Sequence, residues 1–233
     1  GLPVPLAILL AVACVTLIGA CMERLTIRPV QDSPVINLII VTIGVSIFIR
    51  GIASVFMGKE FHVFPPLLSG NASFGGVSIQ SQSLVVIMGA VVIVLLLWLF
   101  LGTTRVGRGI RATAANKLAA QLAGINPALI VCMTFAISAL IGAIGGILVT
   151  PITLTSFDVG TLLAIKGFAA AMLGGLAHPA GPVLGGLLIG LLEAFGAGYI
   201  SSQYKDAFAF LALVAVLFVR PQGILGANSV ERV

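Results

Sequence analysis

The sequence contains very little charge. Only 8% of its 233 residues are Asp, Glu, Lys or Arg, whereas an average soluble domain carries about 25%. Hydrophobic residues make up 59% of the chain, and the mean hydropathy is +1.21. Because so few charges cannot cover a water-exposed surface, the composition excludes a soluble globular domain and predicts a membrane protein.

Cysteine and histidine are also scarce. Cys14, Cys21 and Cys132 lie in apolar stretches at no metal-ligand or disulfide spacing, so we predict small buried hydrophobic side chains. His62 has no second ligand nearby, which favours solvent exposure over metal binding. The apolar stretches contain no Ser/His pair, paired Asp or metal cluster, so we expect neither an enzyme nor a cofactor site in this chain.

The long apolar runs predict an all-α, polytopic transmembrane helix bundle. A helix needs roughly 17–25 residues to cross a hydrocarbon core, and lipid offers no partner for unpaired backbone N–H and C=O groups. We therefore expect about seven spans, the last of them short, at 3–22, 35–57, 83–101, 127–150, 161–177, 181–200 and 207–219.

The basic residues are scattered singly between these runs. This pattern argues against nucleic-acid binding, despite a net charge of +5, and indicates membrane orientation, since Lys and Arg are enriched in cytoplasmic loops. Segments 23–34 and 102–126 and the tail together hold Arg24, Arg28, Arg105, Arg108, Arg111, Lys117, Arg220 and Arg232. The alternate segments hold only Lys59 and Lys205. We therefore place the tail and segment 102–126 in the cytoplasm and loop 58–82, with a hairpin at 77–80, outside.

Small residues recur every four positions on two of the predicted spans. Four-residue spacing allows helix backbones to approach closely, so we predict tight packing along these faces; faces that slide during gating are the alternative. The residues are Ser138, Gly142 and Gly146 on one span, and Gly186, Gly190, Ala194 and Gly198 on another.

Three ionisable residues fall inside apolar windows. A charge at mid-bilayer costs about 2.5–3.5 kcal/mol even on the lenient insertion scale, so each needs a partner or water. We expect Arg50 to snorkel toward the external end and Glu193 to face protein or a water-filled path. Lys166 fits an interfacial or a buried position equally, and a Lys166–Glu193 pair is a hypothesis.

Polar uncharged residues on the second span recur at near-helical spacing. Asn37, Thr42 and Ser46 fit a translocation path and interhelical hydrogen bonds equally well. With Lys166 and Glu193 they are our candidate path residues.

Segment 102–126 is long, polar and basic for a connection between membrane helices. It contains a run of good helix formers from Ile110 to Leu122, with Ile110, Ala114, Leu118 and Leu122 on one stripe. Gly124 is expected to end this helix, and Pro127 to begin the next span. The pattern predicts a short helix lying against another surface on the cytoplasmic side.

Several short motifs follow one another in a specific order over most of the chain after about residue 20. They are Gly107–Arg108 with 111–114, Ala119–Ala120 with 122 and 124–126, 166–168 with 173–175, Gly190 with Glu193, 204–206, and 220–224 with Gly226. In this order they resemble the LivH-type permease subunits of ABC importers for branched-chain amino acids.

The resemblance implies an ABC importer permease fold, a single permease domain over residues 1–233 and more helices before Gly1. It also implies a homologous LivM-type permease partner, cytoplasmic ATPase subunits that use ATP and Mg, and a periplasmic protein that delivers leucine, isoleucine or valine at the bacterial inner membrane. Segment 102–126 would be the coupling element that docks on the ATPase. Its implied coupling residues are Gly107, Arg108, Arg111, Ala112, Ala115, Asn116, Ala119, Ala120, Gly124 and Ile125.

This sequence departs from the family pattern at one coupling position, because the family usually has an acidic residue where Asn116 stands. The charge pairing expected at the ATPase contact differs accordingly. The chain has no G-x-x-x-x-G-K-[ST] phosphate loop, so its energy comes from another polypeptide or an ion gradient. A permease for urea, short amides or other amino acids, and an ion-coupled transporter or channel, are the alternatives.

Overall fold

The computed structural model describes residues 3–31, 33–61, 63–66, 70–74, 77–153, 155–175, 180–199, 201–220 and 222–226. His62, Pro221 and Arg232 lie outside these ranges. The chain forms two compact units, Gly1–Phe157 and Asp158–Val233, which are described separately. The predicted single domain over residues 1–233 stays a prediction.

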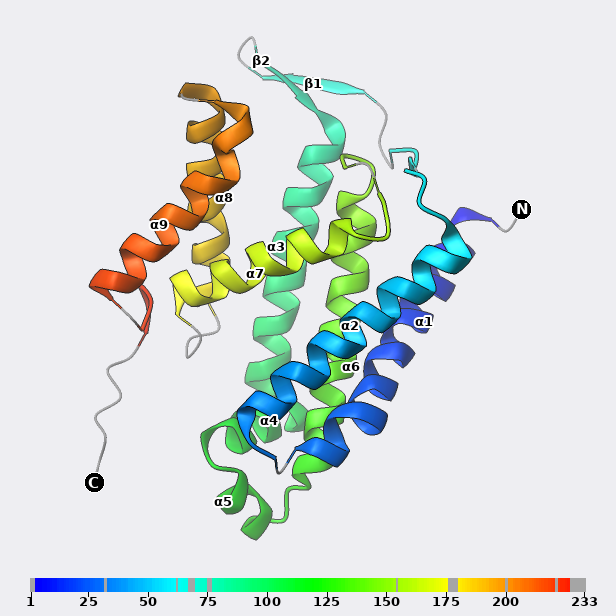
Figure 1. Cartoon of the computed structure of the whole chain (residues 1–233), viewed down its shortest axis with the longest axis vertical. Helices are drawn as coiled ribbons and strands as arrows, with labels where there is room; N and C mark the ends of the chain where they lie inside the picture. Colours follow the sequence, from blue (N-terminus) through cyan, green and yellow to red (C-terminus); the bar gives the residue numbers. More distant parts are fainter. Residues whose placement is uncertain are drawn as a thin grey trace. The chain divides into compact units, whose positions relative to one another are not determined.

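The described residues of the first unit form five apolar or amphipathic helices of eleven residues or more, one short α-helix and a hairpin (Figure 1). In chain order its elements are α1 (Val4–Met22), the π-helical η1 (Glu23–Ile27), the 3-10 turn η2 (Arg28–Val30), α2 (Val35–Met57), β1 (Asn71–Phe74), β2 (Val77–Gln80), α3 (Ser81–Thr103), α4 (Arg105–Ala115), α5 (Lys117–Leu122) and α6 (Pro127–Val149).

Helix α6 is the centre of this unit, because α1, α3 and α4 all contact it. Gly19 of α1 lies so close to Ala139 and the Phe135 carbonyl that a Cβ at position 19 would clash with α6. Near the carboxyl end of α6, the fully buried Gln82 of α3 donates a hydrogen bond from Nε2 to the Leu148 carbonyl at 3.1 Å. Since that carbonyl lies in the last turn of α6, the bond satisfies an acceptor that the helix itself leaves open.

The predicted hairpin is confirmed in loop 58–82. Strands β1 and β2 pair antiparallel, with Asn71 opposite Gln80 and Phe74 opposite Val77. The hairpin leads directly into α3, which begins at Ser81.

The second unit is built from α7 (Val159–Gly174), α8 (Gly181–Tyr199), the 3-10 turn η3 (Ser202–Tyr204) and α9 (Lys205–Val219). Its buried core consists of Ala169, Ala170, Leu173 and Ile189, against which side chains of α9 and the tail pack. Two of the core side chains on α7, Ala169 and Ala170, are small, which allows α7 and α8 to approach closely.

The glycines at the α7–α8 contact differ from those that the sequence pattern indicated. A Cβ at Gly185 would clash with the Ala170 carbonyl, and Gly174 and Gly181 touch each other. By contrast, no atom lies within 4 Å of a Cβ built on Gly142, Gly146, Gly190 or Gly198. Gly186 approaches α7 only loosely, since a Cβ there would lie 3.9 Å from Ala170 Cβ. In the described residues the predicted tight packing is therefore wrong at these four glycines, because α8 is rotated so that Gly181, Gly185 and Ile189 face its neighbour.

The chain after α9 folds back on the end of α7. The backbone N–H groups of Ile224 and Leu225 donate to the carbonyls of Leu173 and Gly174, both at 2.9 Å. Gly223, with φ of +81°, allows this approach, since a Cβ there would stand 2.6 Å from the Met172 carbonyl. The tail thus pairs carbonyls that the end of a helix leaves without partners.

Within the described residues, all seven predicted apolar windows form helices. Among the described residues, five helices are long and apolar enough to cross a membrane, namely α1, α2, α3, α6 and α8. Helices α7 and α9 have 16 and 15 residues, about 24 and 22 Å at 1.5 Å per residue, less than the ~30 Å core. The polytopic membrane bundle is confirmed, and full crossing by α7 and α9 stays a prediction.

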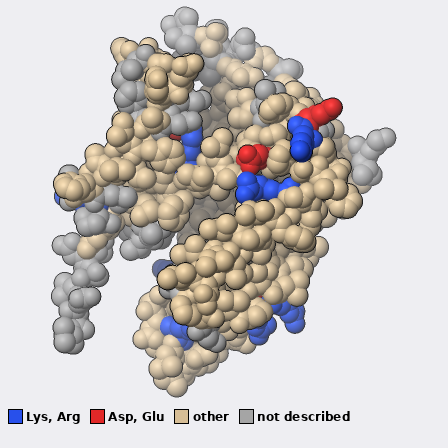
Figure 2. All heavy atoms as spheres, in the orientation of Figure 1, with Lys and Arg blue, Asp and Glu red and all other residues tan. Residues whose placement is uncertain are grey.

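The surface of the molecule matches this class. Charged atoms occupy only small parts of the face in Figure 2, and apolar side chains such as Phe56 and Leu17 are 84% and 64% exposed. Cys14 and Cys21 are exposed and Cys132 is half-buried; all three thiols are free. The prediction that all three are buried is wrong, because an apolar residue on a membrane helix can face outward.

We predict that Gly185→Ala destabilises the protein by about 1–3 kcal/mol, because the new methyl group overlaps the α7 backbone. Gly198→Ala on the same helix has open space and should change stability by no more than about 0.5 kcal/mol. Thermal unfolding of the detergent-solubilised protein measures both. Equal unfolding temperatures for the two variants would contradict the α7–α8 contact.

Candidate functional site

Segment 102–126 is organised as two helices rather than the single helix expected between Ile110 and Leu122. The helix breaks at Asn116, where φ is −159° and ψ is 108°. This extended residue ends α4 and begins α5. The stripe predicted across Ile110, Ala114, Leu118 and Leu122 is therefore divided between two helices and does not form one face.

Side-chain caps hold each helix start in this segment. The Thr104 hydroxyl accepts from the Gly107 N–H at 3.0 Å, and Asn116 Oδ1 accepts from the Ala119 N–H at 2.9 Å. Asn126 Oδ1 accepts from the N–H groups of Ala128 and Leu129. Each cap satisfies a donor that the first helical turn leaves open, so the segment needs no other chain to define its backbone.

The predicted helix stop at Gly124 is confirmed. Gly124 has a φ of +80°, and its N–H donates to the Gln121 carbonyl at 2.9 Å, while the Ile125 N–H donates to the Ala120 carbonyl at 3.0 Å. This is the glycine C-cap arrangement. Pro127 then begins α6, also as predicted.

Two glycines allow α4 to lie close against its neighbours in the first unit. A Cβ on Gly107 would overlap the Phe100 carbonyl of α3 and stand 2.6 Å from Leu101 Cα, and one on Gly109 would stand 2.8 Å from Ile130 Cδ1 of α6. Both glycines are buried. Helix α4 is therefore fixed to the ends of α3 and α6 (Figure 1).

The ten candidate coupling residues divide by exposure. Gly107 and Ala120 are buried, and Ala112 and Ile125 are half-buried, so these four hold the segment to the bundle. The exposed members are Arg108, Arg111, Ala115, Asn116, Ala119 and Gly124. Two leucines that the residue set omitted, Leu118 and Leu122, are 69% and 85% exposed. We call Arg108, Arg111, Leu118 and Leu122 the coupling surface.

In the second unit, the hypothesised pair of Lys166 and Glu193 is confirmed. Lys166 Nζ lies 2.9 Å from Glu193 Oε1, and the side chains are 26% and 20% exposed. The two residues lie on facing turns of the antiparallel helices α7 and α8. Each charge thereby gains the partner that an apolar environment requires.

The three polar path candidates on α2 do not share one face. Asn37 and Ser46 are nine residues apart on a continuous helix, so they point in roughly opposite directions at about 100° per residue. Both are exposed, whereas Thr42 is half-buried and donates to the Ile39 carbonyl at 2.9 Å. Thr42 and Ser46, one turn apart, are the pair that can line a common surface.

Arg50 is half-buried and interacts with a neighbour, and its Nε is buried without a hydrogen bond. The expectation that Arg50 snorkels toward the external end stays a prediction.

One charged residue escaped the sequence reasoning. Glu23 is only 1% exposed, sits in the π-helical turn after α1, and its Oε2 has no hydrogen-bond partner in the described residues. Because Glu23 follows the first apolar window directly, the sequence pattern places it in segment 23–34, which we expect in the cytoplasm. A carboxyl group directly at the end of a predicted span was the one feature of the sequence that could have indicated this burial.

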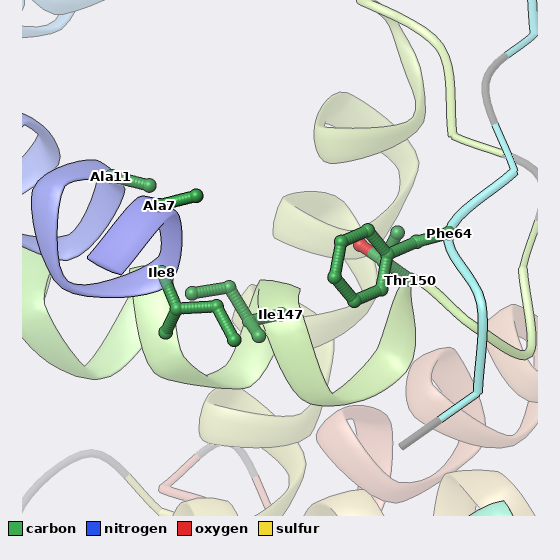
Figure 3. A pocket seen from close by; sticks show the side chains of 6 residues that line it. All are labelled: Ala7, Ile8, Ala11, Phe64, Ile147 and Thr150. Carbon is green, nitrogen blue, oxygen red and sulfur yellow. The ribbon is translucent and has the colours of Figure 1, made fainter. Parts of the chain in front are cut away.

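The first unit also has an apolar pocket of about 250 Å³. Figure 3 shows Ile8 and Ile147 facing each other across it, with Phe64 and Thr150 at one side. Its lining from α1, α6 and loop 58–82 offers almost no polar group, because the Thr150 hydroxyl already donates to the Gly146 carbonyl at 2.7 Å.

Comparison with known proteins now identifies the class. The family of branched-chain amino acid transport system permease components matches residues 1–217. The chain belongs to this family. It is 36% identical to the high-affinity branched-chain amino acid transport system permease protein BraD of Pseudomonas aeruginosa, over 99% of this chain and 78% of that protein.

Other relatives are also named as permeases. The permease is 34% identical to the permease protein LivH of Escherichia coli K12, over 96% of this chain and 74% of that protein. The ribose import permease RbsC of Haemophilus influenzae is 35% identical over 52% of this chain and 40% of that protein. No solved structure gives a significant match.

The family makes this chain a multi-pass membrane permease of an ABC transporter and not itself an enzyme. Such a permease works with an ATPase and a binding protein. The predicted resemblance is thereby confirmed, and the ion-coupled transporter or channel is rejected.

We predict that Gly107→Ala loosens the coupling segment, because a methyl group there overlaps the α3 backbone, and lowers stability by about 1–3 kcal/mol. Gly102→Ala is the matched control in the same connection, since a Cβ there meets no atom within 4 Å. Hydrogen exchange of the α4 amides should accelerate in the first variant only. Identical exchange in both would contradict the fixed attachment of α4.

Proposed function

We propose that this permease forms the translocation path for leucine, isoleucine and valine in an ATP-driven importer of the bacterial inner membrane. Similarity to BraD and LivH over nearly the whole of this chain supports the substrate class, since both are named as branched-chain amino acid permeases. In this proposal the whole chain acts as one permease domain. A LivM-type permease pairs with it, and a periplasmic binding protein delivers the substrate.

The coupling surface is the proposed docking site for a cytoplasmic ATPase, which binds ATP and Mg. The observation that carries this assignment is the exposure of Leu118 and Leu122, at 69% and 85%, on a segment whose backbone is capped and fixed to α3 and α6. Apolar anchors surrounded by charge are typical of protein interfaces. Arg108 and Arg111 give the surface a positive rim that fits an acidic groove.

This geometry also explains how force would reach the membrane. A segment fixed at both ends transmits displacement of the ATPase as a rigid-body movement of α3 and α6. The buried Gly107 and Ala120 would be positioning residues for this movement, whereas the exposed residues make the contact. Asn116 caps the start of α5 through its side-chain oxygen. A neutral residue at this position therefore has a structural role in the segment.

The substrate and energy source are tested together in proteoliposomes that contain the permease pair, the ATPase and the binding protein. We expect leucine uptake to require ATP and the ATPase. Uptake driven by an ion gradient without the ATPase would overturn the proposal. Thr42, Ser46, Lys166 and Glu193 are the proposed path residues, and Asn37 is a weaker candidate on another face.

We predict that Leu118→Ser with Leu122→Ser reduces the ATPase that co-purifies with the permease by about tenfold or more, as expected when anchors worth ~2 kcal/mol or more are lost. Leu25→Ser is the matched control, because Leu25 is 76% exposed and lies in the other basic segment assigned to the cytoplasm. Equal loss in both variants, or no loss in the double variant, would refute the docking assignment.

A further inference from the structure

The ion pair on α7 and α8 lies well inside the apolar part of the second unit. Lys166 follows the first residue of α7, Val159, by seven positions, and Glu193 precedes the last residue of α8, Tyr199, by six. At 1.5 Å per residue both lie about 10 Å from the same end of the hairpin. In the orientation derived from the basic residues, that end faces the side where substrate arrives.

The contact between the two charges is close but not fully satisfied. Glu193 Oε1 lies 2.9 Å from Lys166 Nζ, yet it is buried and makes no hydrogen bond of acceptable direction. A carboxylate oxygen accepts about two hydrogen bonds. The Glu193 oxygen therefore retains acceptor capacity that an additional donor, such as an ammonium group, can fill.

Open space adjoins the pair. Gly167 follows Lys166 directly, and Gly190 lies one turn before Glu193; a Cβ on either would meet no atom within 4 Å. The surrounding α7 side chains Leu163 and Ile165 are apolar and 47% and 48% exposed. A small molecule that reached the pair would find two opposite charges beside an apolar surface.

We propose that Lys166 and Glu193 form an exchangeable ion pair that binds the zwitterionic head group of the transported amino acid. Glu193 accepts the α-ammonium group and Lys166 donates to the α-carboxylate, while the aliphatic side chain lies in the space beside Gly167 and Gly190. Each protein charge exchanges one opposite charge for another, so no unpaired charge is left in the apolar environment. This inference rests on the proposed function.

A purely structural role for the ion pair predicts a different result from a substrate-binding role. Replacing both partners of a buried ion pair by neutral residues of similar size is often neutral or stabilising. Lys166→Met with Glu193→Gln should therefore keep assembly and unfolding temperature. A binding role requires that the same variant fail in transport, because neither substrate charge then has a partner.

The experiment measures ATP-driven leucine uptake by proteoliposomes of the complete transporter. We expect Lys166→Met with Glu193→Gln to lower uptake by about tenfold or more, the equivalent of ~1.4 kcal/mol, without loss of assembly. The charge-exchanged variant Lys166→Glu with Glu193→Lys restores an ion pair but reverses its direction. We expect it to stay impaired, because the substrate cannot match both charges and keep its side chain in the same space.

A steric variant tests the space independently of charge. Gly190→Val places methyl groups beside the pair and should lower leucine uptake, whereas Gly198→Val, at the other open glycine of α8, should not. Wild-type uptake in the neutral pair, restored uptake in the charge-exchanged variant, or failure of the neutral pair to assemble would each overturn the inference. Absence of ATP-dependent leucine uptake in the wild type would instead refute the proposed function.

Discussion

Backbone hydrogen bonding in an apolar solvent constrains every part of this permease. Lipid offers no partner for the N–H and C=O groups at the ends of helices, and the structure supplies those partners from the chain itself. Asn126 caps the start of α6 and Gln82 reaches a carbonyl in its last turn. The tail amides of Ile224 and Leu225 pair with carbonyls at the end of α7. These bonds also join elements that are distant in sequence, so satisfying the backbone positions the helices.

The apolar solvent also determines how the helices contact one another. Lipid gives little drive for association of apolar helices, so close approach through small residues becomes important. Gly19, Gly107 and Gly185 each stand where a Cβ would meet a neighbouring helix. The coupling segment and the ion pair depend on such contacts, because Gly107 fixes α4 to α3 and Gly185 brings α8 against α7. Both the coupling segment and the ion pair are thus positioned by close helix–helix contacts.

Much of the fold could be predicted from residue type alone. Apolar windows located the seven apolar helices but not α4 and α5. The turn residues Gly124 and Pro127 marked where α5 ends and α6 begins. The Lys166–Glu193 pair was also anticipated, because an isolated charge in an apolar window requires a partner. The break at Asn116 was missed, since a run of good helix formers has no strong breaker there and the side-chain cap becomes decisive only in three dimensions. Burial of Glu23 was missed for a similar reason.

The amino-acid sequence by itself determined that this protein spans the membrane as helices, because hydropathy and length act locally along the chain. It also carried the motif order that marks the permease family. Tertiary structure alone decided which faces meet. Gly190 and Gly198 of the regular stripe on α8 face open space, whereas Gly181 and Gly185 make the close contact. Helix rotation causes this difference, since it depends on the summed packing of both partners and no single-helix pattern specifies it.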